Sequence, residues 1–243
     1  MYRSVPKRIP LVVMTNRTAL IVGAGLGLSA ALARRFAADG IRVALAARSV
    51  DKLRVLEAET GARAFACDAT DPVSVNGLFE DVAGELGDPE IVVYNASGRV
   101  RGPLIDLDPL AVEASLAVTA FGAFLVSQAA ARRMVPRASG VILLTGASAS
   151  VKGYAGSAPF AMGKFALRGL AQSMARELAP LGVHVAHIVI DGAIQPPGHA
   201  IDPARPDSRL APEAIAETYS QLARQPKSAW SWEIELRPWV ERF

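Results

Sequence analysis

A glycine-rich turn near the start of the chain has the spacing of an anion-binding site. Gly23, Gly25 and Gly27 follow an apolar run and alternate with apolar residues, Leu26 and Leu28 among them. Glycines let the backbone turn tightly and approach a diphosphate closely. A helix that begins within the turn would offer free N–H groups and a positive dipole end to the same anion. The spacing predicts a dinucleotide site; the alternative is a plain tight turn between a strand and a helix.

The residue after the second expected strand, residues 41–47, bears on which dinucleotide would bind. In dinucleotide-binding folds a carboxylate at this position holds the ribose 2′-hydroxyl. This sequence has Arg48 there instead, next to Ser49. The fork of an arginine can pair with a 2′-phosphate. Arg48 therefore favours NADP(H), with NAD(H) still possible, although a solvated loop residue is the alternative interpretation.

The histidines and the single cysteine do not have the pattern of a reactive site. His184 and His187 are three apart in an expected strand, a spacing that separates their side chains, and His199 stands alone in a proline-rich segment. We therefore expect no metal site. Cys67 is interpreted as a packed thiol, because it lies in an apolar run. One cysteine allows no internal disulfide, and a reducing compartment, the cytoplasm, is expected.

Apolar runs with the length of buried strands alternate with segments of helical spacing along the chain. Strands covered on both faces by helices form parallel sheets. We predict an α/β fold of the doubly wound Rossmann type, with a mostly parallel seven-stranded sheet and helices on both faces. The expected strands are 18–25, 41–47, 62–68, 90–97, 140–146, 183–191 and 232–238. The expected helices are 28–39, 50–60, 71–87, 109–135, 158–181 and 212–224.

Composition narrows the class of protein. The 243 residues are 51% hydrophobic and 20% charged, and the net charge is only +3. We expect one domain over residues 16–243, preceded by a flexible extension, residues 1–15. Because there is no long block of lysine and arginine, we expect no nucleic-acid partner. We also judge no apolar stretch to be long enough to cross a bilayer, and so expect no membrane partner.

Several motifs, in the right order, resemble those of the short-chain dehydrogenase/reductase family over residues 18–240. The turn beginning at Val22 resembles the family's TGxxxGxG, and residues 67–71 its DVTD segment. Residues 95–98 resemble its NAG segment, and residues 121–134 its interface helix. The resemblance implies cofactor contacts at Asp68 and Ala69, at Asn95, Ala96 and Ser97, and after the sixth strand at Asp191, Gly192 and Ile194.

The resemblance carries over only partly to the catalytic residues. Lys164 matches the family's lysine, which holds the nicotinamide ribose and lowers the pKa of a tyrosine four residues earlier. That earlier position holds Phe160, which has no proton to donate. The usual serine maps to Ala147 and the usual asparagine to Thr119. The sequence thus indicates a divergent member with phenylalanine at the tyrosine position.

Three hypotheses follow. The first is an NAD(P)(H)-dependent oxidoreductase for a small apolar carbonyl, alcohol or enoyl compound. In it Tyr154 or Ser148 handles the proton, Lys164 orients the ribose, and residues 192–224 form a substrate lid. The second is a dinucleotide-binding sensor without turnover, and the third is a partner subunit of an active relative. By resemblance, the helix 109–135 suggests a homodimer or homotetramer.

Overall fold

The computed structural model describes residues 17–241, so the expected extension at residues 1–15 lies outside the described residues. Seven strands form one sheet in the order β3-β2-β1-β4-β5-β6-β7, and every pairing is parallel. The strands are β1 Thr18–Val22, β2 Arg42–Ala47, β3 Arg63–Ala66, β4 Ile91–Tyr94, β5 Gly140–Thr145, β6 Val183–Ile190 and β7 Glu233–Leu236. β1 and β4 lie side by side at the point where the strand order reverses, which is where doubly wound sheets bind ligands.

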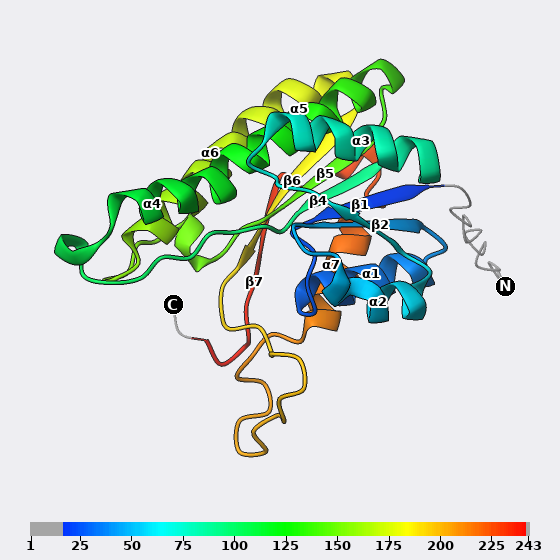
Figure 1. Ribbon diagram of the computed structural model, residues 1–243. Coiled ribbons are helices and arrows are strands. Elements are labelled where there is room, and N and C mark those ends of the chain that lie inside the picture. The colour runs from blue at the N-terminus through cyan, green and yellow to red at the C-terminus, as the bar shows by residue number, and fades with distance from the viewer. Residues whose placement is uncertain (1–16, 242–243) are drawn as a thin grey trace, which may run out of the picture.

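Helices cover both faces of the sheet (Figure 1). One face carries α1 Leu28–Ala38, α2 Arg54–Thr60 and α7 Pro212–Leu222, and the other carries α3 Pro72–Leu86, α5 Gly122–Met134 and α6 Ala158–Leu178. α4, Pro109–Leu116, leads into α5. Each layer closes over its own cluster of buried apolar side chains. The predicted seven-stranded Rossmann-type fold is confirmed.

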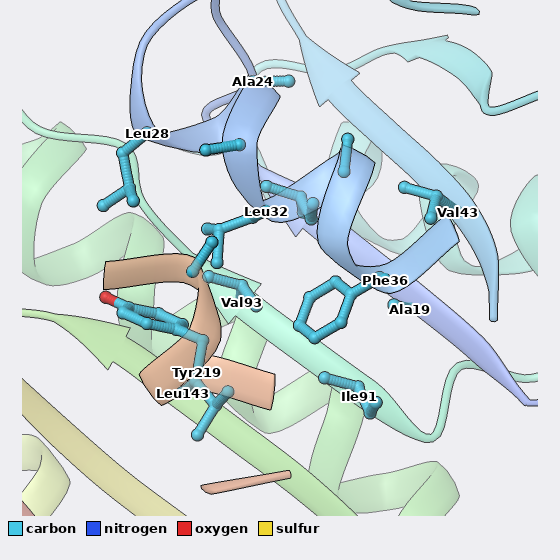
Figure 2. Close-up of a cluster of buried hydrophobic side chains, with 14 of the residues drawn as sticks. Ala19, Ala24, Leu28, Leu32, Phe36, Val43, Ile91, Val93, Leu143 and Tyr219 are labelled. Carbon is cyan, nitrogen blue, oxygen red and sulfur yellow. The ribbon is translucent and has the colours of Figure 1, made fainter. Parts of the chain in front are cut away.

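The core on the α1 face reaches the last helix. Figure 2 shows Leu32 and Phe36 of α1 gathered with Val93 of β4 and Tyr219 of α7. The Tyr219 hydroxyl is 2.8 Å from the Thr145 hydroxyl at the end of β5. α7 is therefore a core helix, and that part of the predicted lid 192–224 does not cover a cleft. Only the loop between β6 and α7 extends away from the sheet (Figure 1).

The expected helix 109–135 is present as one helical segment, Pro109–Arg137, with a change of helix type inside it. Between α4 and α5 the chain makes a π-helical turn, Ala117–Phe121. The Tyr94 hydroxyl donates a hydrogen bond to the carbonyl of Val118 within that turn. Gly122 allows this approach, because a Cβ there would lie 2.5 Å from the Tyr94 hydroxyl. Single π-turns in helices are frequent at functional sites, and this one faces the cleft described below.

The same segment corrects one expectation. By length and composition alone, Pro109–Arg137 would be long and apolar enough to cross a membrane, with a mean hydropathy of 1.8 over its most apolar window. From the sequence, no stretch was expected to be long and apolar enough to cross a membrane. In the fold, buried residues of α5 such as Ala123, Val126 and Ala130 pack in the hydrophobic cluster with α3 and the sheet, as those of a core helix do.

Candidate active site

Two adjoining cavities open at the carboxyl ends of the strands. One, of about 690 Å³, lies over β1 and β2, and the other, of about 830 Å³, lies over β5 and β6. Asn95 and Ser97, which follow β4, line both. The cavities therefore meet where the strand order reverses. Below, the first is called the adenosine cavity and the second the substrate cavity, after the parts that the resemblance assigns to them.

The glycine turn leaves room for an anion beside α1. Gly23 has a φ of +86°, and a Cβ there would lie 2.3 Å from the backbone N of Ala96. At Gly25 and Gly27, by contrast, no non-neighbouring atom of residues 17–241 comes within 4 Å of the Cβ position. α1 begins at Leu28 with no side-chain cap on its first turn. The open space and the uncapped N–H groups fit a diphosphate.

Asn95 holds this turn in place. Its side-chain amide donates to the Ser29 hydroxyl at 2.8 Å, and Ser29 in turn donates to the carbonyl of Gly23 at 3.2 Å. The Asn95 side chain is thus occupied within the protein, although the residue lines both cavities. The neighbouring Ala96 and Ser97 line the adenosine cavity, as the sequence analysis expected of cofactor contacts.

The adenosine cavity brings Arg48, Asp68 and Ala69 together, as predicted, and adds Lys52. The Asp68 carboxylate accepts hydrogen bonds from the backbone N and the hydroxyl of Thr70, at 2.9 and 2.7 Å. These bonds, and to a smaller extent the charge of Arg48, lower the pKa of Asp68. Lys52 was not predicted as a site residue, although its position four residues after Arg48 could have indicated that both lie at the same cavity. Two cations at this rim suit a doubly charged group.

Cys67 lies against the same cavity as a buried thiol whose pKa is raised, chiefly by burial. A raised pKa disfavours the reactive thiolate, in agreement with a packed cysteine.

Lys164 is buried in α6 with its amine at the substrate cavity. Its Nζ donates to the carbonyl of Thr145 at 2.7 Å, and only 4% of the residue is exposed. Burial, and after it the charge of Arg99, lowers the pKa of Lys164 to about 7. The preceding Gly163 sets this position, because a Cβ there would lie 2.9 Å from Cβ of Thr119 in the π-turn.

The three residues that replace the family's tyrosine, serine and asparagine lie near Lys164. The Phe160 ring centroid lies 5.9 Å from Nζ of Lys164 and 4.7 Å from Cζ of Arg99. Ala147 lines the cavity. Thr119 is buried, and its hydroxyl accepts a hydrogen bond from the backbone N of Gly98 at 2.9 Å.

Both predicted proton donors line the substrate cavity and join one polar network. Ser148 interacts with the Asp191 carboxylate and acts to lower its pKa. The same carboxylate lies 3.4 Å from Nζ of Lys152 and 3.2 Å from the guanidinium of Arg237. Burial acts to raise the pKa of Asp191, but these partners lower it overall. Tyr154 is 48% exposed. Burial lowers the pKa of the neighbouring Lys152, but the interactions with Asp191 and Tyr154 raise it by more.

In the segment after β6, some residues line the substrate cavity and Asp191 belongs to the polar network. Gly192 and Ile194, which the resemblance assigns to cofactor contacts, line the substrate cavity. Asp191 was predicted to contact the cofactor too, but its side chain is 4% exposed and held by Lys152 and Arg237.

The histidines of β6 are held separately. The Nδ1 atom of His187 lies 2.9 Å from the Glu233 carboxylate, whereas His184 stacks on Trp230. Among residues 17–241, no group of three or more His, Cys, Asp and Glu side chains is arranged to hold a metal ion.

The reversed strand order, the open glycine turn and the cleft beneath it define the class: an α/β protein of the Rossmann type with its ligand site at the carboxyl ends of the strands. The chain belongs to the short-chain dehydrogenase family, whose model, described as short chain dehydrogenase, matches residues 17–197. Its relatives include dehydrogenases and reductases, which are oxidoreductases.

Three known proteins illustrate the similarity. D-threitol dehydrogenase of Mycolicibacterium smegmatis is 29% identical over an alignment of 228 residues that covers 86% of this chain and 86% of that protein. The crystal structure of a short-chain dehydrogenase from Rhodopseudomonas palustris has a TM-score of 0.81 at 34% identity, covering 92% of this chain and 99% of that one. A metagenomic short-chain oxidoreductase in complex with NADP has a TM-score of 0.81 at 29% identity, covering 93% and 99%.

Proposed function

We propose that this protein is an NADP(H)-dependent oxidoreductase that interconverts a carbonyl compound and its alcohol, or reduces an enoyl compound. The observation that carries the proposal is the continuity of the cleft: it runs from the open glycine turn to the buried amine of Lys164. The solved neighbour that holds NADP supports the same reading. When bound, the nicotinamide would supply or accept the hydride.

The residues of this chain divide the work along the cleft. The backbone of Gly25, Leu26 and Gly27 and the first turn of α1 would bind the diphosphate. Arg48 and Lys52 would bind a 2′-phosphate, and Asp68 and Ala69 would border the adenine. Lys164 would hold the hydroxyls of the nicotinamide ribose.

The proton needs another donor, because Phe160 and Ala147 carry none. We propose Tyr154, with Ser148 as the alternative. Tyr154 faces the substrate cavity and lies beside the ammonium of Lys152. Ser148 faces the same cavity but is engaged with Asp191, so its proton would have to be replaced through that carboxylate.

Substitution of Arg48 tests the coenzyme preference. Arg48→Ala is expected to weaken NADPH binding by roughly 10- to 100-fold, the range for hydrogen bonds to a charged group, and to leave NADH binding nearly unchanged. Fluorescence titration with both coenzymes measures this. Arg54→Ala is the matched control, since Arg54 is exposed on α2 and pairs with Asp51 outside the cavity. Tighter binding of NADH than of NADPH by the unmodified protein would contradict the assignment.

Two substitutions test the proton donor. Tyr154→Phe is expected to lower the rate of carbonyl reduction by roughly 10²–10⁴-fold, the contribution of a positioned acid. Phe160→Tyr would place a hydroxyl on the helical face of Lys164 and is expected to restore at least part of that rate in the Tyr154→Phe background. Single-turnover oxidation of NADPH gives both rates. An unchanged rate in Tyr154→Phe would exclude Tyr154 and leave Ser148→Ala as the next variant.

One observation favours a second function, dinucleotide binding without turnover: two side chains beside Lys164, Phe160 and Ala147, are inert toward protons. A panel of ketones, enones and alcohols, assayed with NADPH, NADH and their oxidised forms, separates the two. Turnover of any substrate supports the oxidoreductase. Binding of NADPH with no turnover across the panel would support a sensor or a partner subunit.

We further propose a homodimer or homotetramer joined through the outer face of α5 and α6. Phe121 and Phe124 are exposed there, with ring centroids 6.2 Å apart, and Met162 and Phe165 of α6 are exposed as well. Exposed aromatic and methionine side chains that gather on one surface are typical of subunit interfaces.

A further inference from the structure

The substrate cavity has an unbalanced positive charge. Two arginines line it, Arg99 and Arg101, beside the amine of Lys164, and no aspartate or glutamate does so among residues 17–241. The remaining lining is neutral and partly apolar, with Phe160, Ile190 and Ile194 among its members. A cavity for a purely apolar compound, which the sequence analysis expected, would gain nothing from these charges.

Within residues 17–241 the two arginines have no oppositely charged partner. Neither Arg99 nor Arg101 makes an ion pair with any carboxylate of the described chain, whereas most other arginines there do. Burial, and then the like charge of Arg101, lowers the pKa of Arg99. Two neighbouring guanidiniums, one partly buried, repel each other unless an anion lies between them.

Arg99 lies close to Lys164, so an anion bound to Arg99 would lie near the proposed reaction centre. Its guanidinium carbon, Cζ, lies over the Phe160 ring, 4.7 Å from the ring centroid, and the amine of Lys164 lies 5.9 Å from the same centroid. A cation–π contact of this kind holds the guanidinium near the ring and leaves its N–H groups free to form a fork with a carboxylate. The ring thus contacts both the arginine and the lysine of the proposed reaction centre.

The cofactor does not account for these charges. The diphosphate has the glycine turn, and the 2′-phosphate has Arg48 and Lys52 in the adenosine cavity. Arg99 and Arg101 line only the substrate cavity, beyond Ser97. The charges of Arg99 and Arg101 are therefore left to bind the substrate.

We propose that the substrate carries a carboxylate in addition to its carbonyl group, and that Arg99 and Arg101 bind this carboxylate. The substrate class is then a small oxo acid or the corresponding hydroxy acid. This inference rests on the proposed oxidoreductase function, because the carbonyl must lie near Lys164. The two arginines are specificity-determining residues and take no part in proton or hydride transfer.

Equilibrium binding tests the proposal without requiring turnover. Calorimetric titration of the protein saturated with NADP⁺ would use acetoacetate and levulinate, each paired with its neutral methyl ester. We expect each acid to bind at least tenfold more tightly than its ester. Arg99→Gln and Arg101→Gln should each weaken binding of the acids by roughly 10- to 100-fold and leave the esters nearly unaffected.

The controls separate this inference from the proposed function. Arg132→Gln makes the same change of charge on α5, outside both cavities, and should alter neither acid nor ester binding. The NADPH affinity of the two arginine variants should match that of the unmodified protein. Equal affinity for acid and ester, or unchanged acid binding in both variants, would overturn the carboxylate site while the oxidoreductase could stand. Failure of the protein to bind NADP⁺ would instead overturn the proposed function.

Discussion

Lys164→Ala is expected to lower the rate of hydride transfer by roughly 10²–10⁴-fold, the range for a positioned acid–base group. The amine is buried and fixed by the Thr145 carbonyl at the proposed reaction centre, so no other described side chain can take its place. Single-turnover measurements with saturating NADPH isolate this step. Lys164→Met is the matched variant, because it keeps an unbranched side chain of similar length and removes the ammonium group with its hydrogen bond to Thr145.

The pH dependence of the unmodified protein gives an independent reading of Lys164. Its pKa of about 7 means that the buried amine loses its proton as the pH rises through neutrality, whereas in the unfolded chain it keeps the proton up to the ordinary lysine pKa of 10.5. Between these values the unfolded state binds more protons, so this group makes the free energy of unfolding rise with pH. Denaturant titrations should show that rise in the unmodified protein and a flatter profile in Lys164→Met. Identical profiles would contradict the burial of a titrating amine.

Gly23→Ala is expected to be the most damaging substitution in the proposed coenzyme site. The φ of +86° is strained for any side chain, by about 1–2 kcal/mol. The added Cβ would also lie 2.3 Å from the backbone N of Ala96, and overpacking of this kind costs about 1–3 kcal/mol. Together the free energy of unfolding should fall by about 2–5 kcal/mol. The turn must also shift away from β4, so NADPH binding should be lost.

Gly40→Ala is the control for Gly23→Ala. Gly40 has a similar φ of +77°, but a Cβ there meets nothing within 4 Å, so only the backbone strain is added. We expect a loss of about 1–2 kcal/mol with NADPH binding intact. Urea denaturation and fluorescence titration on both variants make the comparison. Equal losses of stability, or retained NADPH binding in Gly23→Ala, would argue against the close contact with Ala96.

The elements of this fold could be predicted because each carries a local signal. The strands are short apolar runs, and Gly23, Gly25 and Gly27 stand directly between one of them and a helix. The π-turn had no such signal. It depends on the Tyr94 hydroxyl, which is distant in sequence and donates to the Val118 carbonyl only after β4 and the helix are packed together.

The site was predictable in its cofactor half and less so in its substrate half. Arg48 and Asp68 follow strands directly, so their positions at the sheet edge can be inferred from the sequence. Arg99 and Arg101 lie in an irregular loop, and their meeting with Phe160 of α6 depends on tertiary packing. The lid was placed too broadly for a related reason: Tyr219 and Leu222 have the periodicity of any amphipathic helix, and only the fold shows that they pack on α1.

The wholly parallel sheet has a consequence for how the chain acquires its shape. No strand pairs with its neighbour through a hairpin, and the central pairing aligns Ala19 with Ile91. A growing chain must therefore present all of β4 before β1 gains its second partner, and until then an apolar strand edge stays open. Sheets built from such distant contacts fold slowly and are prone to association on the way. The arrangement that opens a ligand cleft between β1 and β4 is thus also the one that delays completion of the sheet.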